Sequence, residues 1–109
     1  MTTSVFCINL IRKFEKPDAR LILDIDEFLQ KNITQDLAQC QIDALGSIIH
    51  SIGVDAFKAS PLFNIINSDP NSPKVSDYWE IWDKSPNGIE TPQLFDRRKE
   101  ELEMYYYNC

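Results

Sequence analysis

The sequence predicts an all-α fold, a single small helical bundle of about five helices, with residues 1–109 forming one domain. Three observations support this prediction. The chain has 109 residues, 43% of them hydrophobic, which is enough for one core and too few for two of normal size. Its apolar residues recur mainly at helical spacing, between segments that carry helix-capping residues. It contains as many as six phenylalanines and only three glycines, a composition that argues against disorder.

The first segment, residues 4–14 ("SVFCINLIRKF"), suits either a helix or a β-strand, because its apolar residues fit both periods. A single strand would need a partner strand, and no second strand is evident elsewhere in the sequence. We therefore favour a helix and keep the strand as the alternative.

Two longer helices are expected next. Pro17 and Asp18 open a segment that runs to Lys31, with its apolar residues on one side. Thr34 is a suitable N-cap for the following helix, which is expected to end at Gly53, where helices commonly stop in a left-handed residue.

Three further elements complete the expected bundle. Ser60 followed by Pro61 has the cap and first-turn pattern of a short helix, and residues 68–74 ("SDPNSPK") form a loop. Ser76 is expected to cap a helix over residues 75–84, which residues 85–88 ("SPNG") end. The last helix is expected to begin at Thr91 and Pro92 and to run towards Tyr107.

The segment 75–84 contains both tryptophans of the chain. On a helix of about 100 degrees per residue its rings and its acids face opposite ways. The apolar side holds Val75, Tyr78, Trp79 and Trp82, and the other side holds Asp77, Glu80, Asp83 and Lys84. A coherent apolar stripe is usually buried, so we expect the tryptophans to lie in the core.

The last helix has a second acidic row. Its inward face is expected to hold Leu94, Phe95, Leu102, Tyr105 and Tyr106, together with Arg98, whose head would reach water or a carboxylate. Another face presents Asp96, Glu100, Glu103 and Tyr107 at spacings of four, three and four. Like charges at this spacing destabilise a helix, and no cation lies within the row. The row is either an ordinary solvated face or a surface that meets a cationic partner.

The charge of the chain restricts its partners. The formal net charge is −6, and residues 76–109 contain eight acidic and four basic groups. Such a field repels phosphate backbones and anionic lipid, and it favours basic proteins. We therefore expect no nucleic acid and no membrane as a partner. The short apolar run near the N-terminus has no basic residue before it, so it does not resemble a signal peptide, and we expect a cytoplasmic protein.

Nothing in the sequence matches a catalytic, metal or nucleotide motif, so we expect no enzyme and no cofactor. His50, the only histidine, projects to the polar side of its expected helix near the C-terminal end, where a surface or capping role is the plainer interpretation. Cys7, Cys40 and Cys109 are odd in number and widely spaced, which favours reduced thiols over a disulfide framework.

Two segments resemble a known family. An apolar helix leads to a V-D-A-aromatic turn, Val54 to Phe57, within "IIHSIGVDAFKASP" (48–61), and "IETPQLFDRRKEELEMY" (89–105) is an acid-rich closing helix. This layout resembles the small helical immunity proteins of the colicin D type and their relatives among contact-dependent inhibition immunity proteins. The resemblance implies a non-catalytic protein that neutralises a basic nuclease toxin by presenting carboxylates to its nucleic-acid-binding surface.

The leading hypothesis from the sequence is therefore an acidic, non-catalytic, immunity-type inhibitor of a basic nuclease toxin. Its expected partner-binding residues are Asp77, Glu80, Asp83, Asp96, Glu100, Glu103 and Tyr107. Opposite charge would speed association, and a buried aromatic anchor would slow dissociation. Two alternatives remain: a phage-type inhibitor of a nucleic-acid-binding defence complex, and a structural or oligomeric component. The oligomeric state is left open.

Overall fold

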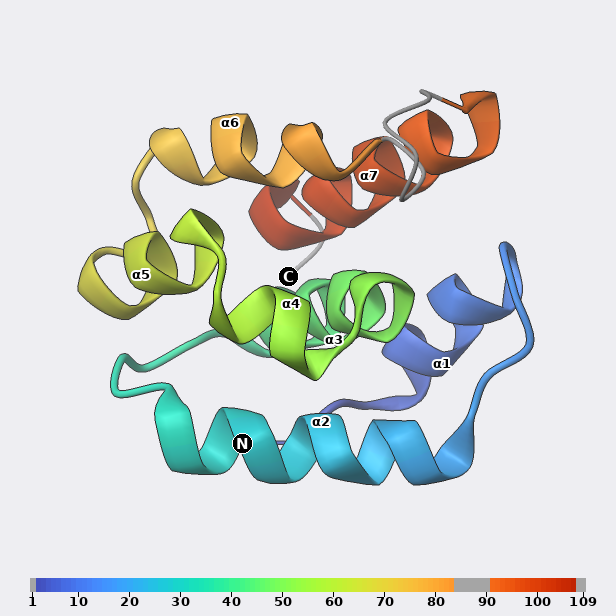
Figure 1. Ribbon diagram of the computed structural model, residues 1–109, viewed down its shortest axis with the longest axis horizontal. Coiled ribbons are helices and arrows are strands. Elements are labelled where there is room, and N and C mark those ends of the chain that lie inside the picture. Colours follow the sequence, from blue (N-terminus) through green and yellow to red (C-terminus); the bar gives the residue numbers. More distant parts are fainter. Residues whose placement is uncertain (1, 84–90, 108–109) are drawn as a thin grey trace.

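The computed structural model describes residues 2–83 and 91–107. Within these ranges the chain forms seven α-helices, one short 3-10 helix and no strand (Figure 1). The all-α prediction is confirmed, and the first segment is a helix. The elements are α1 (Val5–Arg12), α2 (Ala19–Asn32), α3 (Gln39–Ile52), α4 (Val54–Lys58), α5 (Pro61–Ser68), α6 (Lys74–Glu80), η1 (Ile81–Asp83) and α7 (Pro92–Tyr107).

Local capping explains where several helices begin. The side chain of Asp18 accepts hydrogen bonds from two backbone N–H groups in the first turn of α2, and Ser60 accepts one in the first turn of α5, with Pro61 at the first helical position. Ser4 caps α1 in the same way. These bonds satisfy donors that the start of a helix leaves unpaired. At Asp18 and Ser60 the sequence predicted the start correctly.

Two predicted starts were wrong. Thr34 does not cap α3; its hydroxyl and its backbone N–H both donate to the side-chain oxygen of Asn67, at 3.1 and 2.7 Å, and α3 begins five residues later, at Gln39. Ser76 lies inside α6, where its hydroxyl donates to the carbonyl of Pro73 at 3.0 Å. In both places a tertiary or turn contact takes a side chain that could have capped a helix. The predicted end at 85–88 lies outside the described residues.

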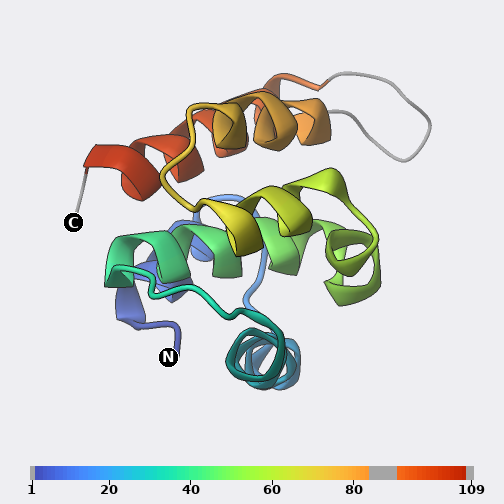
Figure 2. The same ribbon diagram turned by 90° about the vertical axis from the view of Figure 1, so that its left-hand side faces the viewer.

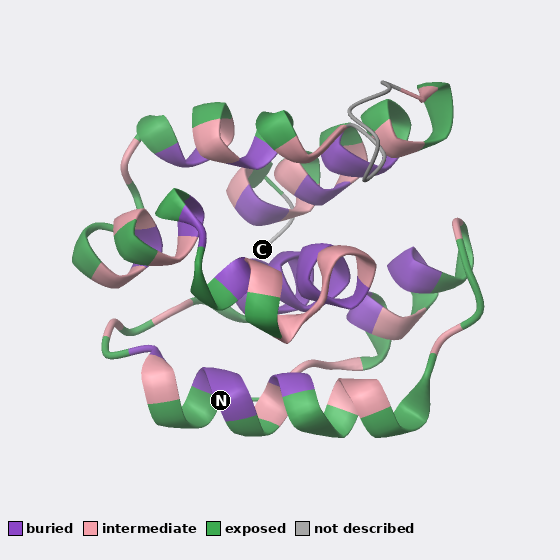
Figure 3. Ribbon diagram, in the orientation of Figure 1, coloured by how far each residue is buried: buried purple, intermediate pink, exposed green. Residues whose placement is uncertain are grey.

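Helix α3 is the centre of the molecule. It contacts α1, α2, α4 and α7, and the layer of α6 and α7 covers one side of it while α2 lies on another (Figures 1 and 2). All residues from Cys40 to His50 are buried, so α3 is surrounded on every side (Figure 3). A helix enclosed in this way is where polar side chains must find partners inside the protein.

The layer of α6 and α7 and the helices around α3 share one core of apolar and aromatic side chains. Trp79 of α6 is fully buried, as predicted, and its ring meets that of Tyr105 at a centroid distance of 5.3 Å in an edge-to-face arrangement. Trp82 is only partly buried. No helix in the described part of the chain has the length and apolar character needed to cross a bilayer.

Gly46 of α3 lies against Cys7 of α1 and against Thr3, which precedes α1. A Cβ atom at this position would lie 2.6 Å from both the sulfur of Cys7 and the methyl group of Thr3. A larger residue would therefore have to displace the side chains of Thr3 and Cys7. Cys7 is a free, buried thiol, whereas Cys40 is disulfide-bonded, so the prediction of reduced thiols is wrong at Cys40.

We expect Gly46→Ala to lower the free energy of unfolding by up to about 2 kcal/mol. The added methyl group overpacks the contact with Thr3 and Cys7 at a cost of about 1–3 kcal/mol, and the gain of about 1 kcal/mol in helix propensity offsets part of that cost. Urea unfolding followed by circular dichroism measures the difference. A variant more stable than the wild type would contradict the close packing.

The thiol of Cys7 gives a second prediction. Burial, followed by the nearby carboxylates of Asp43 and Asp26, raises the pKa of Cys7 from 9.0 to about 12. The folded state thus favours the neutral thiol, and this contribution to stability is complete below pH 9 and is lost as the pH rises towards 12.

The wild type should therefore lose up to about 1.4 kcal/mol of unfolding free energy per pH unit more than Cys7→Ala between pH 9 and 12. Unfolding curves of both proteins at several pH values in this range provide the measurement. Parallel pH dependences would show that the thiol ionises as easily in the folded chain as in the unfolded one.

Candidate functional site

The buried face of α7 is charged. Arg97, Arg98 and Glu101 are each 2% exposed or less, and Tyr105 continues the same face one turn later. This differs from the predicted inward face in two respects: Arg97 and Glu101 were not expected there, and Phe95, which was, is 50% exposed. Buried ions are costly unless they are paired and hydrogen-bonded, so the partners of these groups determine the local structure.

Glu101 is the hub of this cluster. One of its carboxylate oxygens accepts the hydroxyl of Ser47 and the Nε–H of Arg97 at 3.3 Å. The other oxygen accepts the indole N–H of Trp79 at 3.1 Å and lies 3.2 Å from Nε of Arg98. Glu101 thereby connects α7 to α3 and α6.

The two arginines extend the cluster along α3. Arg97 donates from Nη2 to the backbone carbonyl of Ser47 at 2.9 Å, and Arg98 donates from Nη2 to the hydroxyl of Ser51 at 2.7 Å. Burial raises the pKa of Glu101, against the opposing effect of the two guanidinium groups, and burial lowers the pKa of Arg98. Both directions reflect the cost of holding charge away from water.

Glu15 lies where this buried cluster reaches the surface. It follows α1, and its backbone N–H donates to the carbonyl of Ile11 at 3.0 Å. Its side chain is 37% exposed, and one oxygen, Oε1, contacts both Nδ1 of His50 and Nη1 of Arg97, the latter at 3.4 Å. A partly exposed carboxylate is thus fixed from behind by two buried groups.

Neighbouring contacts hold the segment that carries Glu15. The guanidinium of Arg97 lies over the ring of Phe14, 5.7 Å from its centroid. Gln93, at the start of α7, donates to the carbonyl of Phe14 at 3.0 Å. These contacts attach the end of α1 to α7, which places Glu15 beside the polar cluster.

Sequence reasoning missed this site. Glu15 was not singled out, and His50, interpreted as a surface or capping residue, has a side chain only 4% exposed and bonded at both ring nitrogens. The available signal was the position of His50 in the C-terminal half of a helix whose apolar stripe predicts burial, next to the pair Ile48–Ile49. In the described part of the chain, no three His, Cys, Asp or Glu side chains gather closely enough to hold a metal ion.

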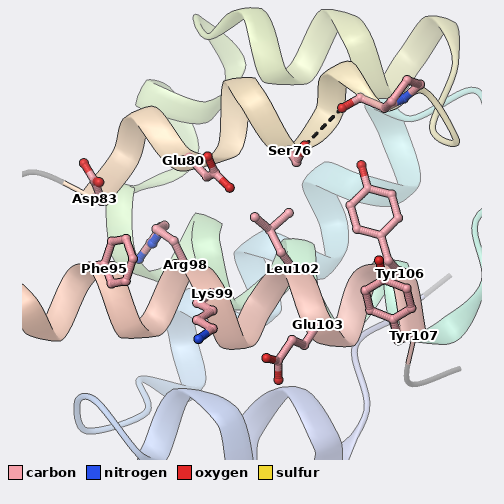
Figure 4. Close-up of a pocket in the computed structure, with 11 residues that line it drawn as sticks. Ser76, Glu80, Asp83, Phe95, Arg98, Lys99, Leu102, Glu103, Tyr106 and Tyr107 are labelled. Carbon is pink, nitrogen blue, oxygen red and sulfur yellow. Dashed lines mark hydrogen bonds between the residues drawn. The ribbon is translucent and has the colours of Figure 1, made fainter.

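The predicted partner-binding residues lie elsewhere. A groove of about 640 Å³ between α6, η1 and α7 is lined by four of the seven, Glu80, Asp83, Glu103 and Tyr107. Figure 4 shows Glu80 projecting from α6 towards α7, whereas Glu103 points away from α6. Asp77, Asp96 and Glu100 do not line this groove. The structure therefore does not gather the seven residues into one surface.

One residue of the predicted acidic row is already neutralised. Glu100 forms an ion pair with Lys13 at 2.8 Å, across 87 residues of sequence. The remaining acids of the row, Asp96 and Glu103, are exposed and form no ion pair with any residue that the structure describes. For these two an ordinary solvated face is sufficient.

The family model for phage lysozyme matches residues 12–101, a range that begins just before Glu15 and ends at Glu101. The chain belongs to the phage lysozyme family. The endolysin of Bacillus phage B103 is 31% identical over 94 residues, which are 84% of this chain and 35% of that protein. The chain thus spans about a third of the length of the curated relative it matches.

Solved structures agree on the fold. The muramidase domain of SpmX from Asticaccaulis excentricus superposes with a TM-score of 0.80 and 20% sequence identity, covering 96% of this chain and 97% of that one. The endolysin from Escherichia coli O157:H7 phage FAHEc1 gives a TM-score of 0.79, also at 20% identity, covering 100% and 96%. At this identity the likeness establishes a shared lysozyme-like helical fold.

These findings correct the functional prediction. The resemblance to colicin D-type immunity proteins is wrong, because the phage lysozyme model covers the V-D-A-F turn and most of the acid-rich helix on which it rested. The prediction of a non-catalytic inhibitor with a basic nuclease partner is therefore wrong. Its two alternatives, an inhibitor of a defence complex and a structural component, are wrong for the same reason. The expectation that the chain is no enzyme is contradicted as well, since the matching family and its relatives are lysozymes, endolysins and a muramidase. An excess of acidic residues does not by itself indicate a binding partner.

The cluster around Glu101 predicts that alanine substitutions at the adjacent residues Glu100 and Glu101 differ widely in their effect on the free energy of unfolding. Glu101→Ala should lower the free energy of unfolding by about 3–5 kcal/mol, because it leaves the buried Arg98 without an ion pair among the described residues and leaves Arg97 with only its longer contact to Glu15. Glu100→Ala removes only the surface pair with Lys13 and should cost at most about 1 kcal/mol.

Urea unfolding of both variants at pH 7 measures the two effects in the same helix, with the same change in side-chain size. Similar losses for the two variants would show that the buried ions are solvated in some other way.

Proposed function

We propose that the chain acts on the glycan strands of bacterial peptidoglycan as a lysozyme-type domain, with Glu15 as the acid that protonates the leaving glycosidic oxygen. Membership of the phage lysozyme family and the names of its relatives, an endolysin and a muramidase, support this substrate class. The observation that carries the assignment is the geometry of Glu15, which is partly exposed and fixed by buried groups on α3 and α7.

Glycoside cleavage sets requirements that few carboxylates of this chain meet. The acid must reach a sugar in solution and must be held in one orientation, because proton transfer depends on a short and aligned contact. Glu101 is held firmly but is fully buried, so no glycan can touch it. Glu103 is exposed, but no contact with a described residue fixes its carboxylate. Glu15 satisfies both requirements.

Glycosidases generally pair the acid with a second carboxylate about 5–9.5 Å away. The next carboxylate along the chain is Asp18, and its side chain caps α2 by accepting the backbone N–H groups of Arg20 and Leu21 at 3.0 and 3.1 Å. Because the carboxylate of Asp18 is engaged as a helix cap, we do not assign it as the second carboxylate. Of the two catalytic carboxylates, we assign only the acid, Glu15, to a residue of this chain.

The test is release of reducing ends from purified peptidoglycan by the full chain, with the products identified by mass spectrometry. Glu15→Gln keeps the shape of the side chain but cannot deliver a proton, so we expect the rate to fall by about 100-fold or more. Glu103→Gln, the same change at an exposed position, should retain the wild-type rate.

Two results would overturn the proposal separately. A wild-type chain that releases no reducing ends would remove the cleavage function. Equal rates for wild type and Glu15→Gln would keep cleavage and transfer the acid role to another residue.

A further inference from the structure

His50 uses both ring nitrogens to join two parts of the connection between α1 and α2. Nε2 accepts the backbone N–H of Asp18 at 3.0 Å, and Nδ1 contacts Oε1 of Glu15. The ring comes from the C-terminal half of α3 and is buried, so neither nitrogen is left to water. The side chain thus bridges Glu15 and Asp18 from the core.

The backbone N–H of Asp18 determines which tautomer the ring adopts. An amide N–H can only donate, so Nε2 must present its lone pair and carry no proton. The single proton of the neutral imidazole is then on Nδ1, where it is donated to Glu15. A second proton on Nε2 would remove the acceptor that Asp18 uses.

The two oxygens of Glu15 therefore have different environments. Oε1 receives the Nδ1–H of His50 and lies 3.4 Å from Nη1 of Arg97. Oε2 forms no hydrogen bond or ion pair with a residue that the structure describes. When Glu15 is protonated, Oε1 is the carbonyl oxygen that accepts these contacts, and the hydroxyl group is Oε2.

We propose that His50 is a positioning residue that holds Oε1 of Glu15 through its Nδ1–H and so presents Oε2 to the glycan. The inference rests on the proposed function for its effect on cleavage, and on the structure alone for the tautomer and the contact. His50 does not itself touch the substrate; it acts through Glu15, in concert with Arg97.

Two substitutions separate positioning from packing. His50→Phe keeps an aromatic ring of similar size but makes neither bond, so the fold should persist while Glu15 is released. His50→Gln has one amide donor and one amide acceptor, so it can restore part of the bridge. Circular dichroism and the thermal midpoint check that both variants are folded.

On soluble, uncross-linked glycan strands we expect His50→Phe to lower kcat by about 10–100-fold, because a misplaced acid loses alignment with the bond it protonates. KM should stay within about twofold, since the ring does not contact the sugar. His50→Gln should recover part of the rate. In a Glu15→Gln background, His50→Phe should have no further effect, because a residue that acts through Glu15 has nothing left to position.

A spectroscopic measurement tests the contact without any activity. The chain has a single histidine, so a long-range ¹H–¹⁵N correlation spectrum reports His50 unambiguously. Near neutral pH we expect a protonated Nδ1 and an unprotonated Nε2, and the carboxyl carbon signal of Glu15 should shift in His50→Phe.

The outcomes distinguish this inference from the proposed function. If the wild type does not cleave glycan, the proposed function falls, and the spectrum still decides whether His50 holds Glu15. A proton on Nε2, an unchanged Glu15 signal in His50→Phe, or a wild-type kcat for that variant would each overturn the positioning role.

Discussion

The carboxylate of Glu101 is the interaction on which the rest of the structure depends. It is fully buried, and it receives Ser47 from α3, Trp79 from α6 and both arginines of α7. Without it, the buried guanidinium of Arg98 would have no ion pair among the described residues, and that of Arg97 would keep only its longer contact with the partly exposed Glu15, at a cost of several kcal/mol. The carboxylate therefore helps to fix how α7 packs on α3 and how α6 packs on α7, where the rings of Trp79 and Tyr105 meet.

The same interaction reaches the candidate site through Arg97. The Nε and Nη2 groups of Arg97 donate to Glu101 and Ser47, so the orientation of the guanidinium is fixed. In this orientation Nη1 lies 3.4 Å from Glu15. Glu15 lies beyond the end of α1 in a connecting segment, where a side chain would ordinarily be free to rotate. Buried groups on two helices remove this freedom. The surface carboxylate is thus ordered by the core, and no long loop is needed to hold it.

Much of the fold could be predicted because its signals are local. Asp18 and the pair Ser60–Pro61 cap helices through contacts within one turn, and the stripe that buries Trp79 lies within a single segment. The site could not be predicted in this way. Arg97 and Glu101 are hydrophilic, and a helical projection assigns such residues to solvent unless their partners are known. Those partners, Ser47 and Trp79, lie 50 and 22 residues away in the sequence.

Charge composition was misleading for a related reason. Three glutamates of this chain have the same chemistry and different roles, set by where each one lies. Glu101 is enclosed and structural, Glu100 is neutralised at the surface by Lys13, and Glu15 alone combines access to solvent with a buried anchor. A net charge of −6 counts the three equally. Acid catalysis of glycan cleavage needs one ordered carboxylate and not an acidic surface, so the excess of acids bears on solubility and the single anchored residue bears on function.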